Sequence, residues 1–114
     1  MEQCLNLDSA LEMLGGEKDL LKELMTAFIN DEQLDENKLK SLENETDTIP
    51  AAVYVHYFKG AARQLGGEKF AAAGQMLEDV LRHKAEGDIP SLHKAVVENY
   101  TELLAALKTS LAEF

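Results

Sequence analysis

The sequence predicts an all-α protein, an antiparallel up-and-down four-helix bundle with a short additional helix at its N-terminus. Apolar residues recur at spacings of three and four along most of the 114-residue chain, and the alternation that marks strands is almost absent. Glycine pairs and capping residues divide the chain into helix-length segments with short connections, which favours neighbouring antiparallel helices. A chain of this length suits one core, so we expect a single domain over residues 1–114.

The first third of the chain predicts a short helix and then a long one. The short helix is expected near Ser9–Leu14, because Ser-Ala-Leu-Glu has the spacing of a capping box and a glycine pair follows. The long helix should begin near Glu17, with an apolar stripe that starts at Leu21 and has resumed by Leu42. The polar stretch NDEQLDEN leaves two alternatives, a break near Asn30 or a continuous helix with an exposed waist. We expect the continuous helix.

Three more helices are expected in the rest of the chain. The third should cover about 50–65, with Asp47-Thr48 as its candidate N-cap and a proline tolerated in its first turn. The fourth should cover about 68–84. The last follows the turn AEGD, takes Asp88 as its cap and carries a nearly heptad apolar stripe. The pentapeptide LGGEK occurs twice, and we interpret both copies as the end of one helix and the start of the next.

Composition excludes several classes of protein. The net charge of −10 argues against binding to nucleic acid or to anionic membrane surfaces. The chain has no run of 18 apolar residues, and its N-terminus lacks the basic start and apolar centre of a signal peptide. Cys4 is the only cysteine, which excludes an internal disulfide and a Cys-rich zinc site. A lone thiol suits a reducing compartment, so we expect a cytoplasmic protein, and a monomer.

Basic residues gather in the middle of this acidic chain. Residues 1–47 hold 13 acidic and 4 basic residues, residues 48–84 hold 3 and 5, and residues 85–114 hold 5 and 2. Chance in a small sample is one interpretation, and a local positive field for an anion is the other. The basic segment contains the stretch VHYFKGAARQLGG, in which a glycine interrupts a helix-forming run close to His56.

A helical wheel of the third helix places His56 away from the core. Each residue turns the helix by about 100°. The predicted core stripe consists of Tyr54, Phe58, Ala61 and Leu65. His56 lies roughly 180° from this stripe. A buried structural histidine therefore fits poorly, whereas a solvent-facing histidine without a role stays open as an alternative.

The neighbours of His56 on the helix surface are small or basic. Positions four residues before and after it hold Ala52 and Gly60, so the imidazole should be uncovered. Lys59 follows at i+3 and Arg63 at i+7, on the same side. We therefore expect an open imidazole on a rigid helix, beside two cations.

This arrangement suits a nucleophile that receives an anion better than a metal ligand. A metal site would need carboxylate or histidine partners at i+3 or i+4, and His83 and His93 lie in other segments. An imidazole can instead attack phosphorus and hold a phosphoryl group as a phosphoramidate. Lys59 would balance the charge of the phosphoryl oxygens, and the missing side chain at Gly60 would let a partner's active site close over His56.

The residues from His56 to Gly66 resemble a family motif. His56, Lys59 and Gly60, followed by Leu65-Gly66, match the pattern H-x-x-K-G-x-x-x-x-L-G of histidine-containing phosphotransfer (HPt) domains of multistep phosphorelays. The stretches LGGEKDLLKELMTAF and FAAAGQMLE, and an acid nine residues before the histidine, also resemble the family, so the likeness covers essentially the whole chain. Phenylalanine and valine at 58 and 55 depart from the usual family residues, but both are apolar changes on or near the core side.

The resemblance implies a role for each site residue. His56 would be the phosphoacceptor through Nε2, Lys59 would stabilise the phosphoryl group and Gly60 would give clearance. Glu78 stands where some members have a residue that hydrogen-bonds the other ring nitrogen, which would fix the tautomer. A solvated helix residue is the equally weighted alternative for Glu78. Arg63 matches no fixed family position, so its role rests on wheel geometry alone.

The resemblance also implies partners. The protein would take a phosphoryl group from the aspartyl phosphate of a receiver domain, in a response regulator or a hybrid histidine kinase, and pass it to another receiver. It would be a phosphotransfer intermediate rather than an enzyme: it needs no cofactor, the Mg²⁺ belongs to the receiver, and no ATP-binding motif is present. Candidate docking residues are Leu34, Val53 and Tyr57.

Two alternatives to a phosphocarrier stay open. The first is an HPt-like interaction module without phosphotransfer, although the histidine, lysine and glycine are all present. The second is an acyl carrier, suggested by Asp8-Ser9 in an acidic helical protein, although this serine comes early in the chain and no leucine follows it directly.

Overall fold

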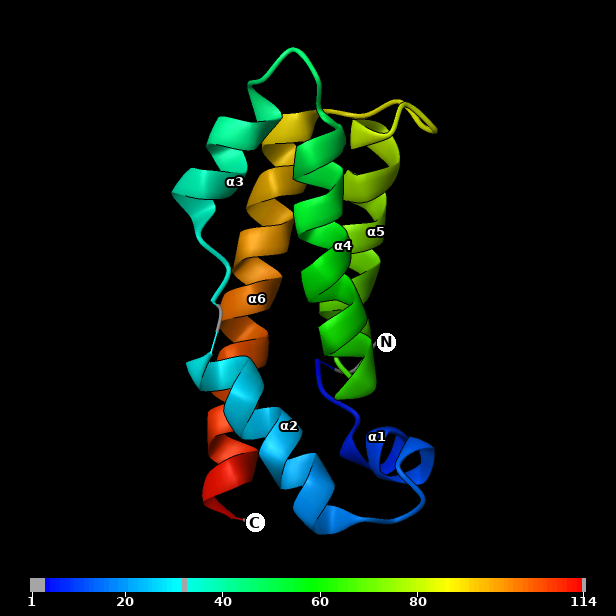
Figure 1. Ribbon diagram of the computed structural model, residues 1–114, viewed down its shortest axis with the longest axis vertical. Coiled ribbons are helices and arrows are strands. Elements are labelled where there is room, and N and C mark those ends of the chain that lie inside the picture. The colour runs from blue at the N-terminus through cyan, green and yellow to red at the C-terminus, as the bar shows by residue number, and fades with distance from the viewer. Residues whose placement is uncertain (1–3, 32, 114) are drawn as a thin grey trace.

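The computed structural model describes residues 4–31 and 33–113 (Figure 1). Over these residues the chain forms six α-helices and no strand, which confirms the predicted all-α class. The helices are α1 (Leu7–Met13), α2 (Lys18–Asn30), α3 (Glu36–Glu43), α4 (Ile49–Gln64), α5 (Glu68–Leu81) and α6 (Ile89–Ala112). None of these helices is both long enough and apolar enough to cross a membrane.

The helices α4, α5 and α6 run side by side along the long axis of the molecule (Figure 1). The most extensive packing joins α4 to α5, and α5 in turn packs along α6. The shorter helices cover the rest: α3 lies against α4 and α6, α2 lies against α6, and α1 contacts α2 and α4. His56 and Glu78 therefore lie on the two helices that are packed together most closely.

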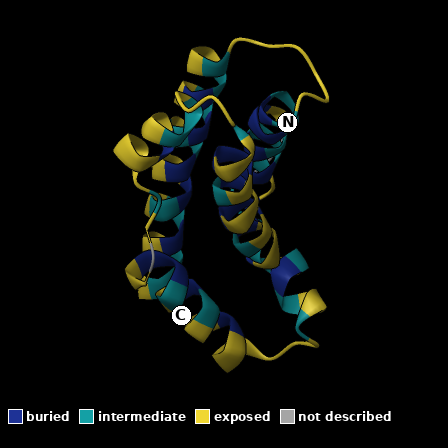
Figure 2. Ribbon diagram, turned by 45° about the horizontal axis from the view of Figure 1, so that its top comes forward, coloured by how far each residue is buried: buried dark blue, intermediate teal, exposed yellow. Residues whose placement is uncertain are grey.

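The core follows the inner faces of all six helices (Figure 2). Its largest fully buried side chains include Phe58, Phe70, Leu21, Met25, Leu39, Leu77 and Leu103. On α4, Phe58 and Leu65 are buried as the wheel predicts, but Tyr54 and Ala61 are only half-buried. The helix also buries a second face of small residues against its neighbours, because helices approach more closely where side chains are small.

The prediction of one continuous helix from Glu17 to Leu42 is wrong, because the helix is interrupted between α2 and α3. Asp35 caps α3, and its Oδ1 accepts hydrogen bonds from the backbone N–H groups of Asn37 (2.9 Å) and Lys38 (3.2 Å). An aspartate that caps a new helix satisfies donors that have no partner within that helix, so the cap stabilises the break.

Two tyrosines from distant helices complete the break. The backbone N–H of Leu34 donates to the hydroxyl of Tyr100 on α6 (3.1 Å), and the N–H of Asp35 donates to that of Tyr54 on α4 (2.9 Å). In a continuous helix these N–H groups would donate to carbonyls one turn earlier. The tyrosine hydroxyls replace those carbonyls, so the connection loses no backbone hydrogen bond at these two residues.

Two other helix boundaries differ from the prediction. Asn6, not Ser9, caps α1: its Oδ1 accepts from the backbone N–H of Ser9 (3.1 Å), so the predicted capping box is wrong. Helix α5 ends at Leu81, short of the predicted end at 84, because His83 takes a left-handed backbone conformation (φ 63°). The predicted cap of the last helix is confirmed, since Asp88 Oδ2 accepts from the N–H of Ser91 (3.2 Å).

The glycines of both LGGEK copies end helices, as predicted. Gly15, Gly16 and Gly66 have φ values of 67°, 82° and 75°, in the left-handed region that glycine adopts without steric cost. At Gly66 a side chain would also overlap the backbone of Asn6, whose N–H donates to the Gly66 carbonyl (2.9 Å). The turn that joins α4 to α5 is thus fastened to the start of the chain.

Candidate functional site

His56 projects from the middle of α4 with 60% of its side chain exposed, as the helical wheel predicts. Its Nδ1 lies 3.2 Å from both carboxylate oxygens of Glu78 on α5. Within residues 4–31 and 33–113 no hydrogen bond involves its Nε2. One ring nitrogen is therefore held by the protein and the other is open to solvent.

Glu78 is a buried carboxylate, only 5% exposed, at the centre of a cluster of donors. Besides His56 it accepts a hydrogen bond from Lys59 Nζ (2.7 Å) and one from Arg82 Nε (2.9 Å). Burial by itself raises the pKa of Glu78, but the hydrogen bonds from Lys59, Arg82 and His56 outweigh it and lower the pKa to about 2. The carboxylate is consequently ionised at neutral pH, and the alternative of a solvated helix residue is wrong.

The ionised Glu78 determines the tautomer of a neutral His56. A carboxylate can only accept hydrogen bonds, so the Nδ1 that faces it must carry the proton. In the neutral ring Nε2 then has no proton, and its lone pair points to solvent. This is the nitrogen that the HPt resemblance names as phosphoacceptor.

Lys59 lies in a different environment from the one predicted. It was expected on the open side of the helix beside His56, but it is only 4% exposed. Its Nζ donates to Glu78 and to Gln75 Oε1 (2.8 Å), both on α5. Helix α5 approaches closely here, and a Cβ added at Gly74 would be in ordinary van der Waals contact with the stem of Lys59 (3.5 Å). The lysine is therefore part of the support beneath His56.

Gly60 is exposed, and a Cβ built on it would meet no atom within 4 Å. The space above α4 next to His56 is thus open, as the predicted clearance requires. Ala52, the other small neighbour, is fully buried against the rest of the protein. Arg63 is exposed and makes no hydrogen bond or ion pair with the described residues, so the structure does not bring it into the cluster.

Sequence reasoning missed two members of the cluster, Arg82 and Gln75. Arg82 follows Glu78 by four residues, a spacing that places oppositely charged side chains together on one helix face, so this ion pair could have been found. Gln75 joins Lys59 to Asp79, because its Nε2 donates to Asp79 Oδ1 (2.7 Å). No sequence signal points to Gln75, since its role depends on how closely α5 approaches α4.

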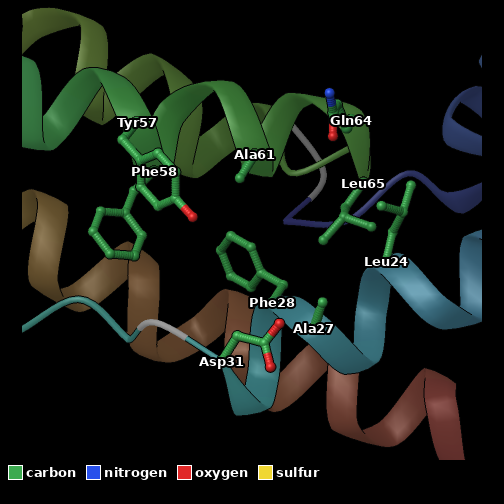
Figure 3. A pocket seen from close by; sticks show the side chains of 9 residues that line it. All are labelled: Leu24, Ala27, Phe28, Asp31, Tyr57, Phe58, Ala61, Gln64 and Leu65. Atoms are coloured by element: carbon green, nitrogen blue, oxygen red, sulfur yellow. The ribbon is translucent and has the colours of Figure 1, made fainter.

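An apolar surface lies beside the histidine. Val53 and Tyr57, two of the predicted docking residues, are each 56% exposed, whereas Leu34 is half-buried. Next to Tyr57 a cleft of about 130 Å³ separates α2 from α4. Figure 3 shows Phe28 pointing from α2 toward α4 across this cleft, with Tyr57 and Phe58 above it. The exposed face of α4 thus combines an imidazole with aromatic and aliphatic side chains.

The described residues contain no group of three or more histidine, cysteine or acidic side chains placed to hold a metal ion. Comparisons of the chain with models of known protein families, with curated proteins and with solved structures gave no match.

Proposed function

We propose that this protein is a histidine phosphocarrier of the HPt type, which accepts a phosphoryl group on His56 from a receiver domain and passes it to another. The observation that carries the proposal is that the two nitrogens of one imidazole have different environments. Nδ1 is held at 3.2 Å by an ionised, buried carboxylate, whereas Nε2 is open on the surface of a helix. A nucleophile oriented by a carboxylate on its far side is the arrangement that group transfer by imidazole needs.

The transfer step needs no further proton donor or acceptor on this chain. Nε2 of neutral His56 attacks the phosphorus of a receiver's aspartyl phosphate, so a phosphorus–nitrogen bond forms. The bond between phosphorus and the aspartyl oxygen breaks, and its electron pair restores the carboxylate. The ring keeps its proton on Nδ1, where Glu78 accepts the hydrogen bond. Attack by a second receiver's aspartate on the phosphoryl group reverses these changes.

The surroundings of His56 support docking by another protein rather than by a small molecule. Gly60 leaves the histidine uncovered, and Val53 and Tyr57 flank it with exposed apolar surface. Receiver domains of response regulators or hybrid kinases are the partners that the motif implies, and they would bring the Mg²⁺. We further propose that α2 and α3 together form one broken arm of an up-and-down four-helix bundle with α4, α5 and α6, in a cytoplasmic monomer.

The test uses phosphorylated receiver domains as donors. A panel of receivers carrying ³²P on their aspartates is mixed with the protein, and transferred label is measured over time. We expect acid-labile label that disappears in His56→Gln. His83→Gln is the matched control, because His83 is exposed and lies outside the cluster, and it should accept label as the parent does.

Two results would overturn this proposal. Label on His56→Gln at the parent's level would mean that another group accepts the phosphoryl. Receivers that bind the protein without transferring any label would instead favour the interaction module.

A further inference from the structure

The proton on Nδ1 of His56 is shared in a hydrogen bond between the imidazole and the carboxylate of Glu78. Both oxygens of the carboxylate lie 3.2 Å from Nδ1, and the carboxylate is buried, so it cannot turn away to solvent. An amide at this position could also accept from Nδ1–H, but it would carry no negative charge. The negative charge at position 78 therefore has an electrostatic effect on the ring, in addition to orienting it.

That charge acts differently once the ring carries a phosphoryl group. A phosphoryl group on Nε2 uses the lone pair there, so a ring that keeps its Nδ1 proton is a phosphoimidazolium cation. When the phosphorus–nitrogen bond breaks, the electron pair returns to Nε2, and this cation leaves as neutral imidazole. A ring that has lost the proton must leave as an imidazolate anion, which is a much poorer leaving group. A carboxylate on Nδ1–H stabilises the cation relative to the deprotonated ring.

We infer that Glu78 keeps phosphorylated His56 in the imidazolium form, so that the phosphoryl group is short-lived and ready for transfer. This inference rests on the proposed function and adds a property that the proposed function does not require. A carrier with Glu78 should serve as a fast relay, whereas an amide at this position would give a longer-lived store.

The other charges around the ring belong to the same cluster. From α4 and α5, Lys59 and Arg82 oppose a positive ring, but both donate hydrogen bonds to Glu78. Asp79 does not contact the ring, and it accepts a hydrogen bond from Gln75. None of the described charged side chains on α1, α2, α3 or α6 forms an ion pair with His56. Glu78 is thus the charged group in direct contact with Nδ1.

The test needs no partner protein, because potassium phosphoramidate can donate to the imidazole. Nε2 displaces ammonia from phosphorus, and the phosphorylated protein is then freed of donor. Its hydrolysis to inorganic phosphate is followed by ³¹P NMR between about pH 5 and pH 10, a window around the histidine range. In the parent, fast hydrolysis should persist to a higher pH than in phosphorylated N-acetylhistidine, a comparison that needs no variant.

Glu78→Gln should shift the pH profile of hydrolysis down by about one unit, and lengthen the half-life about tenfold at pH values above both midpoints. Arg82→Gln should move the profile in the opposite direction, because it removes a cation that competes for Glu78. Glu68→Gln is the matched control, an exposed carboxylate in the first turn of the same helix, and its profile should equal the parent's. Circular dichroism verifies that each variant is folded, and a structural defect alone would not give opposite shifts.

The outcomes separate this inference from the proposed function. If the parent becomes phosphorylated on His56 but its profile matches N-acetylhistidine, or if Glu78→Gln leaves the profile in place, the inference is wrong and the phosphocarrier stands. If phosphoramidate does not phosphorylate His56 in the folded parent, both are wrong.

Discussion

Two histidines of this protein contact glutamates, and the two clusters are built in opposite ways. His56 is mostly exposed, and one carboxylate holds one of its nitrogens. His93 on α6 is 10% exposed, and both of its nitrogens face carboxylates of α3: Nδ1 lies 2.8 Å from Glu43 and Nε2 lies 3.4 Å from Glu36. His56 leaves one nitrogen open to solvent, whereas both nitrogens of His93 contact carboxylates that link α3 to α6.

The buried carboxylates differ as much as the histidines do. Glu78 has two cations as additional donors, and its pKa falls to about 2. Burial raises the pKa of Glu43, and its hydrogen bond from His93 lowers it less than burial raises it. A histidine–carboxylate pair is therefore no sign of function by itself. The difference lies in whether the carboxylate is held by other groups, so that the histidine can be left partly free.

The largest stability effect is expected when the centre of the His56 cluster is removed. Glu78→Leu leaves Lys59 buried without its anion, which should lower the free energy of unfolding by about 3–5 kcal/mol. Urea denaturation measures the change. Replacing the pair together, in Lys59→Met with Glu78→Leu, should recover much of the loss, because apolar side chains of similar size can fill the same space. A single variant as stable as the parent would show that Lys59 does not depend on Glu78.

The two carboxylates should give stability opposite dependences on pH. Because the pKa of Glu78 is lowered from 4.5 to about 2, its contribution is present above pH 4.5 and is lost as the pH falls toward 2. The loss should reach about 3 kcal/mol, and it should be absent in Glu78→Gln. The raised pKa of Glu43 works in the other direction: its contribution is present at low pH and is lost as the pH rises through the folded-state pKa. Urea unfolding of Glu78→Gln and Glu43→Gln across pH 2–6 compares them, and equal slopes would contradict the distinction.

A smaller loss is expected at His93. His93→Leu leaves the buried carboxylate of Glu43 without its hydrogen-bond donor, which should cost about 1–3 kcal/mol in urea denaturation. Phosphoryl acceptance from phosphoramidate should be unchanged under conditions where the variant is folded. Loss of phosphorylation in this variant would mean that the two clusters do not have separate roles.

The smallest change in stability is expected at Gly60, where substitutions should affect stability and phosphoryl transfer differently. Gly60→Ala should raise the free energy of unfolding by up to about 1 kcal/mol, because its Cβ meets nothing and the helix gains a better helix former. Gly60→Leu should slow transfer from a receiver domain while it leaves labelling by phosphoramidate intact, since only a large donor needs the open space. Equal transfer from the receiver in parent and Gly60→Leu would contradict the clearance role.

The sequence predicts those parts of the fold and site that depend on local signals. Three signals each act within a few residues: the helical period, the glycines that end helices and the Asp88 cap. The outward direction of His56 could be predicted from the sequence of α4 alone. The contact with Glu78 lies beyond local reasoning and was suggested by the family resemblance. The burial of Lys59 was missed because it depends on the close approach of α5 at Gly74, which no single helix reveals.

The break between α2 and α3 is held by hydroxyl groups that lie far away in the chain, on Tyr54 and Tyr100. A local substitution that favours helix would therefore compete with two tertiary contacts as well as with the Asp35 cap. Phenylalanine at both tyrosines would remove the competing acceptors and keep the rings. The shape of this arm of the molecule thus depends on two oxygen atoms that lie outside it, in addition to its own Asp35 cap.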